Sequence, residues 1–132
     1  MSILHRILET DVHLLKLNRP LSGRWANELE QKFKDALDRG ARQVVVDLED
    51  VPLVDSRGLA ALVKGYKTFG SNGQTFQLAA LQEQPRLLLE LTMFDRIFQV
   101  FDSVAEAIES IPQHSIQFVQ ETRAFVPQLV VR

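Results

Sequence analysis

A short run of branched apolar residues near the middle of the chain, Val44-Val45-Val46-Asp47-Leu48, constrains the fold more than any other feature. A strand that faces water on one side alternates apolar and polar residues, whereas this run is apolar at nearly every position. Such a strand is covered on both faces, which is typical of the centre of a parallel sheet flanked by helices. We therefore expect an α/β fold with this strand inside the sheet.

The segments around this strand alternate between strand-like and helix-like patterns. Two β-rich segments, residues 3–8 and 12–17, are joined by a short polar stretch and predict an antiparallel hairpin. Apolar residues at three- and four-residue spacing predict four helices, over residues 25–40, 55–70, 84–94 and 103–112. Further strands are expected at residues 75–80 and 97–101. The order predicts a sandwich with four helices and a mixed, largely parallel sheet of four to five strands.

The length of 132 residues suits one domain, since a single core serves chains of about 100 to 200 residues. We expect this domain to span residues 1–112. Residues 113–132 form an apolar C-terminal extension that either packs on the domain, packs on a second copy to give a homodimer, or is partly disordered.

Composition and charge exclude several classes of protein. Fifteen Lys and Arg stand against seventeen Asp and Glu without a basic stripe, so nucleic acid is not an expected partner. No apolar run approaches the roughly 20 residues needed to span a bilayer. The first residues lack the pattern of a secretory signal, and we expect a cytoplasmic protein without a membrane partner.

The chain offers little for catalysis. It has no cysteine, and its three histidines, His5, His13 and His114, lack the helical spacing of a zinc site. No serine lies in a nucleophile elbow, and the glycines around Ser71 lack the Lys-Ser/Thr pair of a phosphate-binding loop. Because no nucleophile, base and orienting group can be named together, we expect neither an enzyme nor a bound cofactor or metal.

Four carboxylates that lie close in sequence leave one alternative open. Asp47, Glu49, Asp50 and Asp55 could hold Mg²⁺ together with water and phosphate oxygens. Glu49 and Asp50, however, resemble solvated turn residues, and this weakens the magnesium hypothesis.

The stretch Asp55-Ser56-Arg57-Gly58 follows the central strand and opens a helix, at the end of an α/β sheet where functional sites usually lie. Its simplest role is to cap the helix, with Asp55 or Ser56 accepting a hydrogen bond from a backbone amide. Beyond it, a set of small residues is predicted on the non-core face of the helix, where a partner's backbone can approach closely. These residues are Gly58, Ala60, Ala61 and Gly65.

Residues 3–111 resemble the STAS family, named for sulfate transporters and anti-sigma factor antagonists. The most specific match is the run from Val44 to Leu59, which resembles the family's strand, apolar loop and Asp-Ser-x-Gly-Leu helix start. The resemblance implies a STAS-type sandwich, and in stand-alone members it implies phosphorylation of the serine after the aspartate, here Ser56. Asp55 would then accept a hydrogen bond from this serine, help to hold the kinase's Mg²⁺, or simply cap the helix.

The resemblance further implies an anti-sigma factor antagonist that works by partner switching. The unphosphorylated chain binds an anti-sigma serine kinase of the histidine-kinase-like ATPase class, phosphorylation ends this binding, and a PP2C-type phosphatase restores it. ATP and Mg²⁺ belong to the kinase. The partner-binding residues expected on this basis are Ser22, Asp55, Ser56, Arg57, Gly58, Ala60 and Ala61.

Two positions depart from the family pattern. Arg19-Pro20-Leu21-Ser22 stands where the family often has Gly-x-Leu-Asp, and Arg57 stands where a Ser or Thr is common. Both departures bear on the identity of the partner. The alternative function is a STAS-type scaffold or ligand-binding subunit, in signalling or lipid transport, in which Ser56 is only the helix cap.

Overall fold

The computed structural model describes residues 3–9 and 11–110 of the 132. The strands are β1 (Ile3–Glu9), β2 (Val12–Leu17), β3 (Gln43–Asp47), β4 (Thr75–Ala79) and β5 (Gln99–Phe101). The helices are α1 (Arg24–Asp38), α2 (Ser56–Ser71), α3 (Glu83–Thr92), α4 (Val104–Glu109) and the 3₁₀ turn η1 (Phe94–Arg96). The predicted C-terminal extension, residues 113–132, lies outside the described residues.

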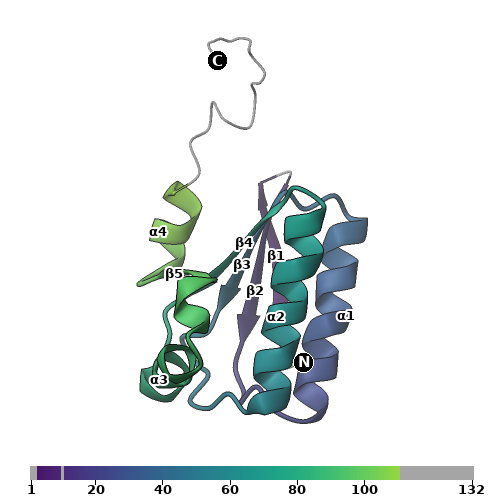
Figure 1. Ribbon diagram of the computed structural model, residues 1–132. Coiled ribbons are helices and arrows are strands. Elements are labelled where there is room, and N and C mark those ends of the chain that lie inside the picture. The colour runs from purple at the N-terminus through teal and green to yellow at the C-terminus, as the bar shows by residue number, and fades with distance from the viewer. Residues whose placement is uncertain (1–2, 10, 111–132) are drawn as a thin grey trace.

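The five strands form one mixed sheet in the order β1-β2-β3-β4-β5. Strand β1 is antiparallel to β2, and all other neighbours are parallel. Helices α1 and α2 lie side by side over one face of the sheet, while α4 packs on the other (Figure 1). All five residues of β3 are buried, so the predicted central strand and the predicted α/β fold are confirmed.

The chain differs from the sequence prediction around residue 97. Met93 adopts a left-handed backbone conformation and ends α3, and η1 follows it. Ile97 and Phe98, predicted to begin a strand, form a turn after η1. The rings of Phe94 and Phe98, whose centres are 6.2 Å apart, pack against each other at this turn. Strand β5 therefore begins only at Gln99.

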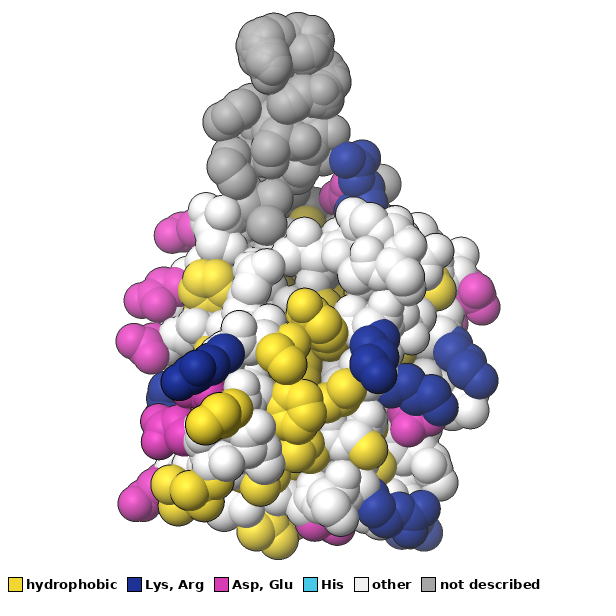
Figure 2. Space-filling view, viewed as in Figure 1, with side chains coloured by type: hydrophobic (Ala, Val, Ile, Leu, Met, Phe, Trp, Pro, Cys, Tyr) yellow, Lys and Arg dark blue, Asp and Glu magenta, His cyan; other side chains and the backbone are white. Residues whose placement is uncertain are grey.

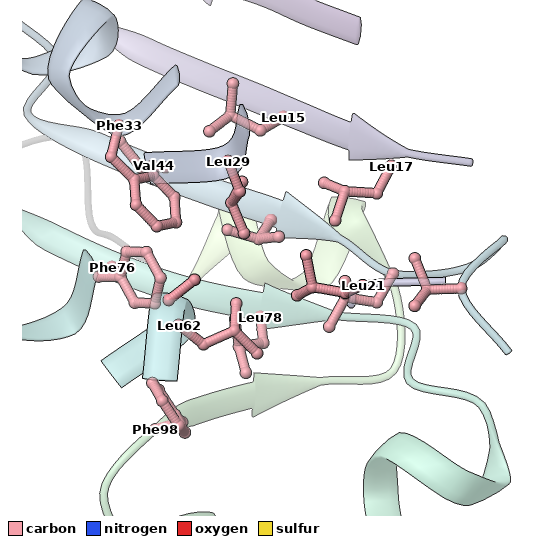
Figure 3. Packing of buried hydrophobic residues seen from close by; sticks show 14 of the residues in the cluster. Leu15, Leu17, Leu21, Leu29, Phe33, Val44, Leu62, Phe76, Leu78 and Phe98 are labelled. Atoms are coloured by element: carbon pink, nitrogen blue, oxygen red, sulfur yellow. The ribbon is translucent and has the colours of Figure 1, made fainter. Parts of the chain in front are cut away.

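Aromatic rings fill the core between the sheet and its two long helices. Phe33 from α1, Phe69 from α2 and Phe76 from β4 meet with ring centres 5.3 to 6.1 Å apart. Around them pack buried leucines such as Leu29 and Leu62 (Figure 3). This cluster holds α1 and α2 together and sets the height of α2 above the sheet.

The prediction that the small residues of α2 form an exposed face is wrong for three of the four. Gly58, Ala61 and Gly65 are buried, and only Ala60 is exposed. The pattern rule assigns the largest apolar residues of a helix to the core, and it therefore leaves the small residues of α2 on the exposed face. The rule fails here because α2 approaches its neighbours too closely for larger side chains.

The spacing around these glycines shows how close the approach is. A Cβ atom at Gly65 would lie 2.5 Å from the ring of Phe33 and 2.8 Å from that of Phe76. A Cβ atom at Gly58 would overlap the backbone carbonyl of Leu21. The small residues therefore serve packing within the domain.

We expect Gly65→Ala to lower the free energy of unfolding by about 1 to 3 kcal/mol, because the added methyl group must displace two packed rings. Gly70→Ala on the same helix is the matched control, since a Cβ atom there meets nothing within 4 Å. This control should be neutral or stabilise by up to about 1 kcal/mol, as alanine favours the helix. Urea denaturation measures both, and equal stability of the two variants would contradict the close packing at Gly65.

Two histidines and an aspartate link the β1–β2 hairpin to α1. His5 Nε2 lies 2.8 Å from His13 Nδ1, and His5 Nδ1 lies 3.3 Å from Asp35 Oδ2. We assign the Nδ1–H tautomer to both rings, so that His5 donates to Asp35 and His13 donates to His5. This leaves a lone pair on His13 Nε2, in keeping with the burial of that atom without a hydrogen-bond partner.

Burial, which disfavours the charged imidazolium, lowers the pKa of both histidines below 6.5. The His5 ring also lowers the pKa of His13, and Arg39 lowers the pKa of both histidines, while Asp35 raises both. The unfolded chain therefore binds more protons than the folded chain below about pH 6.5. The folded state must lose stability as the pH falls from that value toward the folded pKa values.

We predict that the free energy of unfolding decreases between about pH 7 and pH 5, and that this decrease is smaller in the double variant His5→Gln, His13→Leu. Urea titrations at half-unit pH intervals measure the effect. Since His114 is present in both proteins, the difference between their slopes reports the buried pair. Parallel pH profiles would rule out its contribution.

Candidate functional site

The N-terminus of α2 lies beyond the carboxyl end of β3, as the sequence predicted. Asp55 is the capping residue, with an extended backbone, and its Oδ1 accepts a hydrogen bond from the Gly58 amide at 2.8 Å. Ser56 is the first residue of the helix and is exposed. Of the roles considered for Asp55, the structure thus shows the helix cap.

The loop that precedes α2 is held by the segment that follows β2. Leu21 N donates to Leu53 O at 2.9 Å, and Asp55 N donates to Leu21 O at 3.3 Å, which makes a one-residue parallel bridge between Leu21 and Val54. Ser22, which is partly exposed, directly follows Leu21 of this bridge, while Ser56 comes two residues after Val54. Residues separated by more than thirty positions in the sequence are joined here by backbone hydrogen bonds alone.

A side chain from α3 holds the other side of this loop. Gln84 Oε1 accepts from Val54 N at 2.9 Å, and Gln84 Nε2 donates to Val54 O at 3.1 Å. Gln82 Nε2 donates to Glu49 O at 2.7 Å, near the start of the loop. Sequence reasoning missed both glutamines. The sequence near a helix start does not show which distant backbone groups a polar side chain will bond to.

The predicted partner-binding residues divide into exposed and buried groups. Ser56, Arg57 and Ala60 are exposed, whereas Gly58 and Ala61 are buried. The assignment of Gly58 and Ala61 to a docking surface is therefore wrong, since no partner can reach them. Gly58 instead lets α2 lie close to the backbone of Leu21, and Ala61 packs in the hydrophobic core.

Exposed apolar side chains gather near the site, over α3 and the turn that follows it. Figure 2 shows a band of apolar side chains running between α2 and α3. Leu87, Leu91, Met93 and Ile97 are exposed, Leu91 by 74%. Tyr66 of α2, predicted to be a core residue, is 38% exposed, with its ring edge-on to Phe98. Exposed apolar surface of this kind is typical of a protein-binding site.

The acidic residues that raised the magnesium hypothesis surround a lysine. Lys16 Nζ lies 3.3 Å from Asp47, 3.2 Å from Glu49 and 3.4 Å from Asp50. Burial alone would lower the pKa of Lys16, but hydrogen bonds to these carboxylates raise it above its usual value. The ammonium group takes the place that a cation would need, and Asp55 is engaged as a cap. No group of three His, Asp or Glu side chains within residues 3–9 and 11–110 is arranged to hold a metal ion.

Comparison with known proteins assigns the chain to a family. The family model described as the STAS domain matches residues 7–107, and the chain belongs to this family. A Thermotoga maritima protein, provisionally named an anti-sigma factor antagonist, is 31% identical over 102 residues, which are 76% of this chain and 90% of the relative.

Solved structures agree with this assignment. The crystal structure of a Thermotoga maritima protein of the same provisional name aligns with a TM-score of 0.77 and 30% identity, over 83% of this chain and 93% of the other. The anti-sigma factor antagonist SpoIIAA in its unphosphorylated form aligns with a TM-score of 0.73 over 83% of this chain and 95% of its own. At 12% identity, SpoIIAA shows the shared fold only. The predicted STAS-type sandwich is confirmed.

In the described part of the chain, none of the helices combines the length and the apolar character needed to cross a bilayer.

We expect Asp55→Ala to lower the free energy of unfolding by about 1 kcal/mol, since the Gly58 amide loses its side-chain acceptor. Asp55→Ser is the matched control, because serine also caps helices well and should retain most of the stability. Thermal and urea unfolding measure both changes. If the alanine and serine variants were equally stable, the cap would contribute nothing.

Proposed function

We propose that this protein is an anti-sigma factor antagonist that binds an anti-sigma serine kinase while Ser56 is unphosphorylated and releases it once Ser56 is phosphorylated. The observation that supports the proposal most directly is the exposed hydroxyl of Ser56, which stands at the start of α2 beside an exposed apolar surface. The names of relatives that are 31% identical support the general class. The phosphorylation step rests on the match of Asp55-Ser56 to the family pattern.

The position of Ser56 is suited to carry a phosphate. A phosphate adds about −1.5 to −2 charge units, and the N-terminus of a helix stabilises negative charge nearby. The side chain needs no rearrangement to reach a kinase, because it is already exposed. The free phosphoprotein should therefore fold as the unphosphorylated protein does.

The same charge opposes binding when a partner covers the site. A partner that packs on Leu87 and Leu91 of α3 and on the exposed start of α2 would remove water from Ser56. A doubly charged group left without water or counter-charge costs several kcal/mol. A cost of about 4 kcal/mol weakens binding about a thousandfold, which is enough for a switch.

The remaining parts of the cycle lie with other proteins. The kinase supplies ATP and Mg²⁺, and a PP2C-type phosphatase removes the phosphate. In this proposal the chain itself catalyses nothing and acts in the cytoplasm. The structure of SpoIIAA in a phosphorylated form shows a protein of the same fold in such a state, although its 12% identity extends to this chain only the fold.

The test compares Ser56→Ala and Ser56→Asp in binding to the anti-sigma serine kinases of the same organism, measured by calorimetry. Ser56→Ala should bind as tightly as the unphosphorylated protein, and Ser56→Asp should bind at least about tenfold more weakly, because aspartate brings part of the phosphate's charge. Ser71→Asp places the same charge at the far end of α2 and should leave binding unchanged.

Incubation with kinase and ATP should add one phosphate, located at Ser56 by peptide mass spectrometry, and Ser56→Ala should accept none. Equal binding by the alanine and aspartate variants would overturn the switch. It would favour the scaffold function, in which Ser56 serves only the helix start.

A further inference from the structure

One side-chain amide satisfies both backbone groups of Val54, two residues before Ser56. Gln84 accepts from Val54 N at 2.9 Å and donates to Val54 O at 3.1 Å, the pattern that a neighbouring strand would provide. On the opposite side, the backbone of Leu21 pairs with the residues that flank Val54. Val54 thus lies between two partners, the backbone of Leu21 on one side and the side chain of Gln84 on the other.

This pairing on both sides fixes the geometry of the helix start. Val54 is 2% exposed, so without Gln84 its amide and carbonyl would be buried with fewer partners. Asp55 follows directly and places its carboxylate on the Gly58 amide. A shift of the loop at Val54 would move this cap and with it the hydroxyl of Ser56.

Gln84 also connects the loop to the exposed apolar side chains of α3. It lies in the first turn of α3, and Leu87 and Leu91 follow it at three and seven positions, on the same side of the helix. Both leucines are exposed, by 49% and 74%. A protein that packs on these leucines therefore contacts the same helix whose Gln84 side chain holds the loop before Ser56.

We infer that Gln84 is a positioning residue for Ser56: it fixes the loop that presents the serine and couples that loop to contact at the exposed face of α3. The fixing of the loop depends only on the observed hydrogen bonds. The coupling rests on the proposed function, since through this coupling a partner bound at α3 would change how Ser56 is presented to the kinase.

The decisive variant is Gln84→Met, which keeps the length of the side chain and loses both hydrogen bonds. Amide hydrogen exchange at Val54 should become at least about tenfold faster, while the amides of the central strand β3 exchange as before. Gln84→Glu keeps the acceptor for Val54 N and should restore most of the protection of that amide. Gln31→Met, at an exposed glutamine of α1, is the control for the substitution itself.

The second readout is the rate at which the anti-sigma serine kinase phosphorylates Ser56. Gln84→Met should lower kcat/KM several-fold at temperatures where the variant is still fully folded, because the hydroxyl is presented in the productive geometry for a smaller fraction of the time. Gln31→Met should match the parent protein. A merely structural role for Gln84 would change the unfolding midpoint and leave kcat/KM unaffected.

The outcomes separate this inference from the proposed function. Unchanged exchange at Val54 in Gln84→Met overturns the role of Gln84, whatever the Ser56 variants do. Faster exchange with an unchanged phosphorylation rate overturns the coupling, while the switch itself stands if Ser56→Ala and Ser56→Asp differ in binding. If those two variants bind alike, the proposed function and the coupling fail together, and the exchange rates alone decide whether Gln84 fixes the loop.

Discussion

The backbone pairing between Leu21 and Val54 is the constraint on which the site depends. It joins the chain that leaves β2 to the chain that leaves β3, although these segments are distant in sequence. With the loop fixed on this side, Asp55 is placed to cap α2 and Ser56 is placed at the surface. The closeness of Gly58 to the Leu21 carbonyl is part of the same arrangement, because the pairing leaves no room for a larger residue.

The two faces of α2 differ in burial and in the size of their side chains. The buried face carries Gly58, Ala61 and Gly65, and their small size lets the helix lie against α1 and the sheet. The outward side of the first turns carries Ser56, Arg57 and Ala60, which face solvent. The exposed surface of α2 is consequently smaller than the sequence suggested, and Leu87 and Leu91 of α3 are exposed apolar side chains.

The fold was predictable from the sequence because its signals are local and repeated. The uninterrupted apolar run at residues 44–46 marked the central strand, and apolar residues at three- and four-residue spacing marked the four helices. The start of α2 at Ser56 was predictable for the same reason. The direction of its buried face was not, because small residues pack inward only where another part of the chain comes near, and that is set by tertiary structure. The contact of Gln84 with Val54 was out of reach for a similar reason, as it joins residues thirty positions apart.

Because Arg57 and Ala60 face solvent while their neighbours Gly58 and Ala61 are packed, mutations that alter the exposed surface and mutations that alter folding fall on different positions of one helix turn. Duplicated copies of such a gene can therefore diverge at positions 57 and 60 with little loss of stability. Each copy would then present a different surface at the start of α2 on an unchanged fold.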